Sequence, residues 1–270
     1  MEAEGLELKR IVVKVGTSTI THSTGKINLR RVDMLTRALA DIMNMGHEVV
    51  LVSSGAVGVG VGKMGLEKKP TSTREKQALA AIGQAGLVSM YDKFFKEYGY
   101  NTGQVLLTKF ILDEEMRYRS AKRAFETMIK YNVIPIVNEN DVISSYEIEF
   151  GDNDTLSAYV AELVDADLLV LMSDIDGFYT DNPNTNPDAR LISVVEEITE
   201  EIKKCAGGEG SSRGTGGMRT KLKAAKIVNS CGIDMIITNG ANPENLYKIV
   251  QGESVGTLFK SPNPRIKSRK

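Results

Sequence analysis

The chain has 270 residues, of which 41% are apolar, and its formal net charge is −1. This length and composition fit either one α/β domain or two lobes around a cleft. The nearly balanced charge argues against a protein that binds nucleic acid or a membrane surface. No apolar run approaches the roughly 20 residues of a membrane-spanning helix, and the N-terminal MEAEGLELKR is unlike a signal peptide. We therefore expect a cytoplasmic protein.

Short apolar runs alternate with helical patterns along the chain. In chain order, the pattern predicts a strand at 10–16, a helix at 28–46, a strand at 47–55, a helix at 74–99, a strand at 103–110, a helix at 116–131, a strand at 132–140, a helix at 155–166, a strand at 167–174, a helix at 221–232, a strand at 233–240 and a short helix at 243–252. Because the strands are rich in Val, Ile and Leu, this α/β alternation predicts a mostly parallel sheet covered on both faces.

Cysteine and histidine are scarce, which limits the available chemistry. Cys205 and Cys231 form no CxxC pair and suit a reducing compartment. His22 and His47 lack the spacing of a zinc site, and each lies beside turn-like sequence. We interpret both histidines as surface residues.

Polar residues lie at the carboxyl ends of four of the predicted strands. They are Lys14 with Gly16–Thr17–Ser18, Ser53–Ser54–Gly55, Asn138–Glu139–Asn140–Asp141 and Ser173–Asp174. Ligands of parallel α/β sheets collect at the carboxyl ends of the strands. These groups are therefore expected to line one site.

The segment GVGKMG at 60–65 matches the GxGxxG pattern. It does not join a strand directly to a helix, as a dinucleotide site requires. We interpret it as a flexible loop over a small substrate. The sequence also lacks the Walker motif GxxxxGK[ST] and the HRD and DFG triplets of protein kinases.

The segment GTGG at 214–217 leads into the helical pattern that contains Lys221. Consecutive glycines and a helix N-terminus both offer backbone N–H groups to an anion. A flexible loop before a surface helix fits GTGG equally well. Arg219 and Lys221 favour the phosphate site, because the helix dipole disfavours cations at this end unless an anion is present.

Lys14 and two acidic-amide clusters complete the candidate site. A buried, unpaired lysine is costly, so Lys14 is expected to face the carboxyl ends of the strands, where ligands bind. A lysine at an outer edge of the sheet is an equal alternative. With Lys221 it could clamp a transferring phosphoryl group. Asp152–Asn153–Asp154 begins a predicted helix, which needs only one of them as a cap. Together with 138–141 and Ser54–Gly55, this cluster suits the ammonium and carboxylate groups of an amino acid.

Seven motifs occur along the chain: KVGTSTIT, VSSGAVGVG, QALAAIGQ, PIVNEND, FGDNDTLSA, SDIDGFYTDNP and GTGGMRTKLKAA. In this order they resemble the glutamate 5-kinase family of the amino acid kinase superfamily, over about residues 10–260. The resemblance implies a three-layer αβα sandwich formed by one domain, 1–270. It implies a substrate-binding lobe at 10–165, a nucleotide-binding lobe at 166–260 and a polar tail at 261–270.

The activity implied by the resemblance is ATP-dependent phosphorylation of the side-chain carboxylate of L-glutamate. The products are L-glutamyl 5-phosphate and ADP, and the reaction is the first step of proline biosynthesis. One alternative is a sister kinase for another carboxylate or for carbamate. The other is a non-catalytic amino-acid or nucleotide sensor with the same fold.

The resemblance also implies roles for individual residues. Lys14 and Lys221 would be the transition-state cations, and Asp154 would be the catalytic carboxylate that organises them. The implied glutamate-binding residues are Ser54, Gly55, Asn138, Asp141, Asp152 and Asn153. The implied ATP-binding residues are Lys14, Gly16, Ser173, Asp174, Thr215, Gly216, Gly217, Met218 and Lys221. Ser173 stands where the family commonly has threonine, and both residues carry a hydroxyl group.

The resemblance extends to ligands and partners. Mg²⁺ is expected to arrive on ATP without a direct protein ligand. Proline is expected as a feedback inhibitor, the assembly as a homodimer or homotetramer, and the next enzyme of proline synthesis as a functional partner. Nucleic acid and membranes are not expected partners. Many family members carry a C-terminal RNA-binding-like (PUA) domain, and this sequence resembles the form without it.

Overall fold

A computed structural model describes residues 9–22, 26–67, 70–144, 150–183, 185–207 and 217–263 of the chain. Its main strands are β1 (Arg10–Val15), β2 (Glu48–Ser53), β3 (Asn101–Leu107), β4 (Val133–Glu139), β5 (Leu168–Ser173), β8 (Val194–Val195), β9 (Asp234–Asn239) and β10 (Thr257–Phe259). They form one sheet in the order β3-β4-β2-β1-β5-β9-β10-β8. Only β9 and β10 pair antiparallel among these neighbours. Two further short strands, β6 (Phe178–Tyr179) and β7 (Leu191–Ile192), form a separate antiparallel pair.

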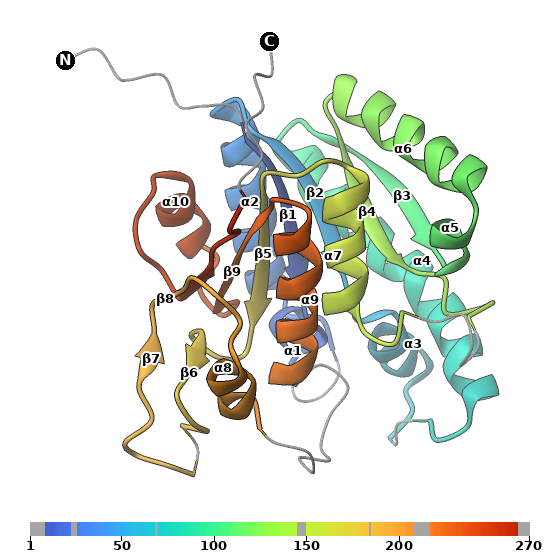
Figure 1. Cartoon of the computed structure of the whole chain (residues 1–270). Helices are drawn as coiled ribbons and strands as arrows, with labels where there is room; N and C mark the ends of the chain where they lie inside the picture. The colour runs from blue at the N-terminus through green and yellow to red at the C-terminus, as the bar shows by residue number, and fades with distance from the viewer. Residues whose placement is uncertain are drawn as a thin grey trace.

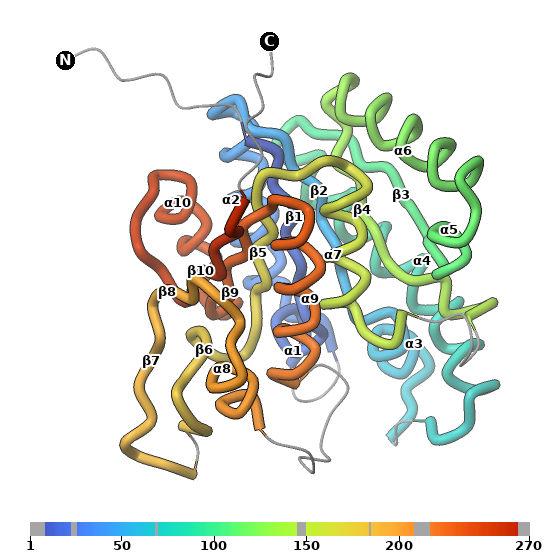
Figure 2. The backbone as a smooth tube through the Cα atoms, in the orientation of Figure 1, coloured from blue at the N-terminus to red at the C-terminus, as the bar shows by residue number. Residues whose placement is uncertain are grey.

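Helices cover both faces of the sheet (Figure 1). One face carries α6 (Glu115–Lys130), α7 (Asn153–Leu163) and α9 (Met218–Ser230). The other carries α2 (Leu29–Asn44), α4 (Thr73–Glu97) and α10 (Asn245–Val250). The other helices are α1 (Thr17–Ile20), α3 (Ala56–Met64), α5 (Phe110–Asp113) and α8 (Glu200–Cys205). The backbone trace in Figure 2 shows α7 and α9 side by side. Within the described ranges, no helix is long and apolar enough to cross a membrane.

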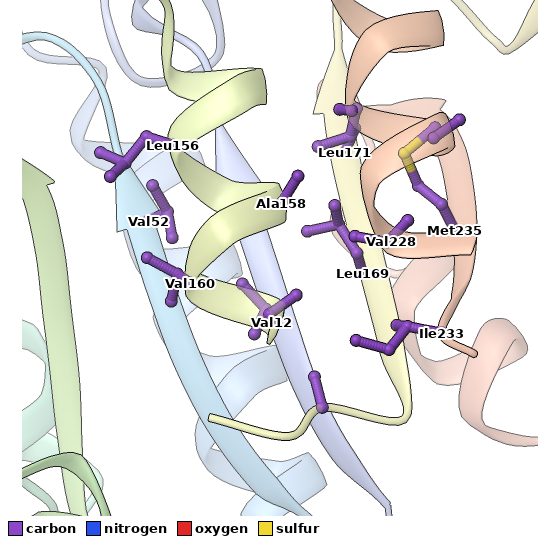
Figure 3. Packing of buried hydrophobic residues seen from close by; sticks show 14 of the residues in the cluster. Val12, Val52, Leu156, Ala158, Val160, Leu169, Leu171, Val228, Ile233 and Met235 are labelled. Atoms are coloured by element: carbon purple, nitrogen blue, oxygen red, sulfur yellow. The ribbon is translucent and has the colours of Figure 1, made fainter. Parts of the chain in front are cut away.

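The two-residue period of β1 divides its side chains between two hydrophobic clusters. Ile11, Val13 and Val15 join the cluster under α2 and α4. Val12 joins the other cluster, where Figure 3 shows it with Ala158 of α7. Because every residue of β1 is buried, its sequence is almost continuously apolar, as expected of a parallel strand covered on both faces.

The predicted architecture is confirmed. Each of the six predicted strands overlaps a strand of the sheet, and the six predicted helices correspond to α2, α4, α6, α7, α9 and α10. Both α7 and α9 begin earlier than the apolar period indicated, because Asn153, Asp154 and Met218 already belong to the first turns. This matters for the site, which lies at these helix starts.

The prediction of a loop at 60–65 is wrong, because most of this segment belongs to α3. Its glycines allow α3 to contact α4 closely. A Cβ atom on Gly60 would lie 2.0 Å from the carbonyl oxygen of Leu79, and one on Gly83 would lie 1.8 Å from that of Ala56. Only glycine fits at such distances, so the GxGxxG spacing here reflects helix packing.

The prediction of a surface position is wrong for His47 and confirmed for His22. His47 is 3% exposed and lies just before β2, at the end of the sheet remote from the predicted site. Its Nδ1 accepts a hydrogen bond from the backbone N–H of Lys9 at 3.2 Å. Burial lowers the pKa of His47, and the nearby charge of Lys9 lowers it further.

Candidate active site

One carboxylate lies between two lysines. Lys14 Nζ is 2.6 Å from Oδ1 of Asp154, and Lys221 Nζ is 3.1 Å from Oδ2. Lys14 is 8% exposed, Lys221 4% and Asp154 1%. The structure therefore brings together the three residues that the sequence marked as catalytic, from β1, α7 and the first turn of α9.

Local structure explains how each of the three side chains reaches this point. Lys14 follows Val12 on the face of β1 that α7 covers, and its neighbours in the register are Val52 of β2 and Leu171 of β5. Asp154 lies in the first turn of α7, where the helix dipole favours a negative charge. Lys221 lies in the first turn of α9, where the dipole disfavours a positive one.

We expected an external phosphate to explain the cations at the start of α9. In the structure, the anion next to Lys221 is a protein carboxylate, that of Asp154. Arg219 is exposed and takes no part in this contact. Two lysines and one aspartate still carry a formal charge of +1 in a nearly buried position, so an anionic ligand would stabilise the cluster.

Opposing effects act on the ionisation of Asp154. Burial disfavours its charged form, whereas the ammonium groups of Lys14 and Lys221 favour it, and the net result is a lowered pKa. Asp154 is therefore ionised at neutral pH and holds both cations. With each oxygen next to an ammonium group, it is poorly placed to bind a metal ion as well.

Thr220 is a further member of the cluster that the sequence analysis missed. Its hydroxyl lies 3.0 Å from Oδ2 of Asp154 and 2.7 Å from the carbonyl oxygen of Gly217, and it can donate its one proton to either. This links the N-cap of α9 to the carboxylate on α7. The signal available in the sequence was a hydroxyl residue directly before Lys221.

The amides predicted to bind substrate form a row. Asn153 Nδ2 donates to Oδ1 of Asn138, and Asn138 Nδ2 donates to Oε1 of Gln84, each at 2.9 Å. Gln84, on α4, was not predicted. Asn138 and Gln84 are buried, and Asn153 is half-buried at the start of α7.

Asp152 and Asp141 take different positions. Asp152 is the N-cap of α7, because Oδ1 accepts from the N–H of Thr155 at 2.8 Å and Oδ2 accepts from its hydroxyl at 2.9 Å. Asp141 lines a cavity of about 260 Å³ between α4, β3 and residues 139–142, which Gln84 and Gln104 also line. Asp152 thus has the capping role expected of one residue in its cluster.

Ser54 and Gly55 form the turn from β2 to α3. The N–H of Ser54 donates to the carbonyl oxygen of Val15 at 3.1 Å, which joins this turn to the end of β1. Gly55 has φ of +111°, a conformation that favours glycine. Gly16, the N-cap of α1, follows β1 directly. The predicted phosphate and carboxylate binders therefore share the carboxyl ends of adjacent strands.

The predicted nucleotide residues lie on the neighbouring part of the sheet. Ser173 ends β5, the strand paired with β1, and its hydroxyl donates to Oδ1 of the exposed Asp174 at 3.0 Å. Gly217 is the N-cap of α9 and Met218 its first residue. Thr215 and Gly216 lie outside the described residues. Within the described part of the chain, no group of three or more His, Cys, Asp or Glu residues could hold a metal ion.

The chain is similar to known proteins over most of its length. Residues 9–239 match the model of the Amino acid kinase family. The glutamate 5-kinase of Clostridium perfringens (strain 13 / Type A) is 58% identical over 255 residues, which cover 93% of this chain and 95% of that protein. The glutamate 5-kinase of Thermoanaerobacter sp. (strain X514) is 50% identical, over 97% of this chain and 70% of the relative.

A solved structure supports the fold independently. Carbamate kinase from Giardia lamblia, bound to AMP-PNP, superposes with a TM-score of 0.67 over 94% of this chain and 99% of that one, at 19% identity. At this identity the similarity concerns the fold alone, and it matches the layers seen here.

Proposed function

The chain belongs to the amino acid kinase family, and we propose that it transfers the γ-phosphoryl group of ATP to the side-chain carboxylate of L-glutamate. The products are L-glutamyl 5-phosphate and ADP, as in the first step of proline biosynthesis. The observation that carries this proposal is the 58% identity to a glutamate 5-kinase over 95% of that relative. The charged cluster around Asp154 supplies chemistry that fits it.

In this reaction a carboxylate oxygen of glutamate attacks the γ-phosphorus of ATP. The bond from that phosphorus to the β,γ-bridging oxygen breaks, and ADP leaves with the electron pair. A carboxylate is already ionised at neutral pH, so no general base has to remove a proton. Catalysis then depends on positioning and on neutralising charge on the phosphoryl oxygens.

Lys14 and Lys221 are the groups suited to that neutralisation. They approach from β1 and α9, and their contacts with Asp154 hold them in place before substrate arrives. Cations that are already oriented need little rearrangement in the transition state. Asp154 thus acts by fixing the two ammonium groups, while its own charge is offset by them.

In this proposal, glutamate and ATP bind on different sides of the cluster formed by Lys14, Asp154 and Lys221. Amide and carboxylate groups suit the ammonium group of glutamate, and the hydroxyl and N–H groups of the β2–α3 turn suit its α-carboxylate. The proposed glutamate-binding residues are Ser54, Gly55, Asn138, Asp141, Asp152 and Asn153. The proposed ATP-binding residues are Lys14, Gly16, Ser173, Asp174, Thr215, Gly216, Gly217, Met218 and Lys221. The proposed glutamate-binding residues all lie in the proposed lobe at 10–165, and the ATP-binding residues other than Lys14 and Gly16 lie in the lobe at 166–260.

Mg²⁺ is proposed to arrive bound to the phosphates of ATP. This fits the engagement of both Asp154 oxygens with ammonium groups. Three further proposals rest on the resemblance of the motifs to glutamate 5-kinases: feedback inhibition by proline, a homodimeric or homotetrameric assembly, and functional coupling to the next enzyme of proline synthesis. A cytoplasmic location is also proposed, in line with the scarcity of cysteine.

The test is formation of γ-glutamyl hydroxamate by the purified protein with ATP, Mg²⁺, glutamate and hydroxylamine, which traps the acyl phosphate. Product is expected only when ATP and glutamate are both present. Lys221→Ala protein, purified identically, controls for contaminating kinases. Release of ADP with aspartate, N-acetylglutamate or carbamate, but not with glutamate, would contradict the proposal and favour a sister kinase.

A further inference from the structure

Helix α4 carries a row of polar side chains at seven-residue spacing: Gln77, Gln84, Tyr91 and, at its C-cap, Tyr98. Seven residues are close to two turns, so the four side chains point to one side of the helix. Each makes a hydrogen bond to another part of the chain. At the ends of the row, Gln77 donates to the carbonyl oxygen of Ser144 at 3.3 Å, and Tyr98 donates to Asp33 of α2 at 2.7 Å. The two central bonds lead toward the proposed glutamate site.

Gln84 is the last amide of the row on the α4 side, and its buried Nε2 has no hydrogen-bond partner within the described residues. Its Oε1 accepts from Asn138 Nδ2, and Oδ1 of Asn138 in turn accepts from Asn153 Nδ2. Because each NH₂ group points to the next carbonyl, the row ends with Oδ1 of Asn153 as an acceptor. An acceptor at this position suits an ammonium group. Gln84 is 8% exposed, so water does not compete strongly for this arrangement.

Tyr91 acts on the turn after β2 through a second chain of hydrogen bonds. The hydroxyl of Ser53 donates to the carbonyl oxygen of Ser54 at 3.0 Å, and its oxygen lies 2.9 Å from that of Tyr91. Ser53 has one hydroxyl proton, so Tyr91 must be the donor in the second bond. Burial raises the pKa of Tyr91, which keeps this donor protonated.

The bond from Ser53 sets the peptide plane between Ser54 and Gly55. In a trans peptide the carbonyl and the N–H point in opposite directions, so fixing the Ser54 carbonyl also directs the N–H of Gly55. Helix α4 is itself held against this region. Gly83, next to Gln84, lies so close to Ala56 at the start of α3 that a Cβ atom would be 1.8 Å from its carbonyl oxygen.

We propose that Gln84 and Tyr91 are positioning residues for the amino-acid substrate. From one face of α4 they orient the groups that contact glutamate, Gln84 through Asn138 and Asn153 and Tyr91 through Ser53, while touching neither the lysines nor the phosphoryl group. The inference rests on the proposed function, because it takes these groups to bind glutamate.

The test compares Gln84→Met and Tyr91→Phe with Tyr98→Phe. The last variant removes a hydroxyl hydrogen bond from the same row, but one that leads to α2. Tyr91→Phe and Gln84→Met are each expected to raise the glutamate KM about three- to tenfold, the usual range for one hydrogen bond, with a smaller change in kcat and no change in the ATP KM. Tyr98→Phe is expected to leave both KM values unchanged.

Calorimetric titration of glutamate into the same proteins separates this inference from the proposed function. If the wild type binds glutamate but forms no hydroxamate, the function fails, and weaker binding in the two site variants still supports the inference. Unchanged binding and KM in both variants overturn it, and so does an equal loss in Tyr98→Phe. A wild type that does not bind glutamate overturns both. If Gln84→Met does not fold, Tyr91→Phe, which removes one oxygen atom, decides alone.

Discussion

The ammonium group of Lys14 lies 2.6 Å from Asp154, and this contact ties the central strand β1 to the first turn of α7. Lys221 occupies the other oxygen of the same carboxylate, from α9. A single aspartate therefore sets the spacing of two cations that come from opposite ends of the chain. Without it, two nearly buried ammonium groups would repel each other at short range.

Lys221→Ala should reduce turnover far more than it weakens glutamate binding. The lysine is proposed to stabilise charge that develops in the transition state, and removing one such group typically costs about 10²- to 10³-fold in kcat. Loss of a transition-state contact lowers kcat and kcat/KM together. Steady-state kinetics with varied glutamate checks this. Lys223→Ala, on an exposed face of the same helix, should be close to wild type. Unchanged turnover in Lys221→Ala would remove this lysine from the mechanism.

The lowered pKa of Asp154 predicts acid sensitivity of the fold. Burial opposes ionisation, but Lys14 and Lys221 outweigh it, so the folded pKa lies below the unfolded value of about 3.9. The stabilisation from this carboxylate is then complete above about pH 4 and is lost as the pH falls through the lowered folded pKa. Urea unfolding across this range should show the loss.

Asp154→Asn is the variant that isolates this effect. At neutral pH it should lower the free energy of unfolding by roughly 3 kcal/mol, because it leaves two buried cations without a counter-charge. Its stability should also change less with acid than that of the wild type. Asp188→Asn, which removes a carboxyl group from an exposed position, should keep the wild-type pH profile. An equally acid-sensitive Asp154→Asn protein would show that other carboxylates cause the loss.

The sheet could be predicted from the sequence because the residue patterns that produce its strands and helices are local. Each buried strand is a short apolar run, and the period of each long helix is visible in the order of its own residues. The polar strand ends were informative for a related reason, since carboxyl ends of parallel strands meet at one edge. Lys14 is the clearest case, because a cation inside an apolar strand needs a partner, and Asp154 is that partner.

The features that sequence did not reveal depend on contacts between distant segments. The glycines of α3 suggest a loop, but Gly60 packs closely against the backbone of Leu79 on α4. His47 lies in turn-like sequence, yet it is buried. Gln84 and Thr220 join the site through hydrogen bonds to residues far away along the chain. Apart from the hydroxyl residue directly before Lys221, local patterns carry no signal for such pairings, which tertiary packing decides.

Asn153→Ala should mainly raise the KM for glutamate. The residue ends the amide row at the start of α7, so its loss removes an acceptor for the ammonium group and also takes away the donor to Oδ1 of Asn138. An increase of about three- to tenfold corresponds to one lost hydrogen bond. The KM for ATP, measured in the same experiment, provides the internal control. A change confined to the ATP KM would contradict the assignment of Asn153 to glutamate.

Gly83→Ala should destabilise the contact between α3 and α4. An alanine normally stabilises a helix interior relative to glycine, by about 1 kcal/mol. At Gly83 the added Cβ would lie 1.8 Å from the carbonyl oxygen of Ala56, a rigid backbone atom, so the helices must separate. Overpacking of this kind costs roughly 1–3 kcal/mol, measurable by urea unfolding.

Gly86→Ala, one turn further along α4, is the matched control for Gly83→Ala. Its Cβ would meet the side chain of Lys63 at 3.2 Å, and that flexible chain can move aside. Gly86→Ala should therefore be neutral or stabilising. Because Gly83 also precedes Gln84, its alanine variant should raise the glutamate KM, whereas Gly86→Ala should not. Equal effects of the two substitutions on stability would mean that glycine flexibility, and not the close approach to Ala56, explains these positions.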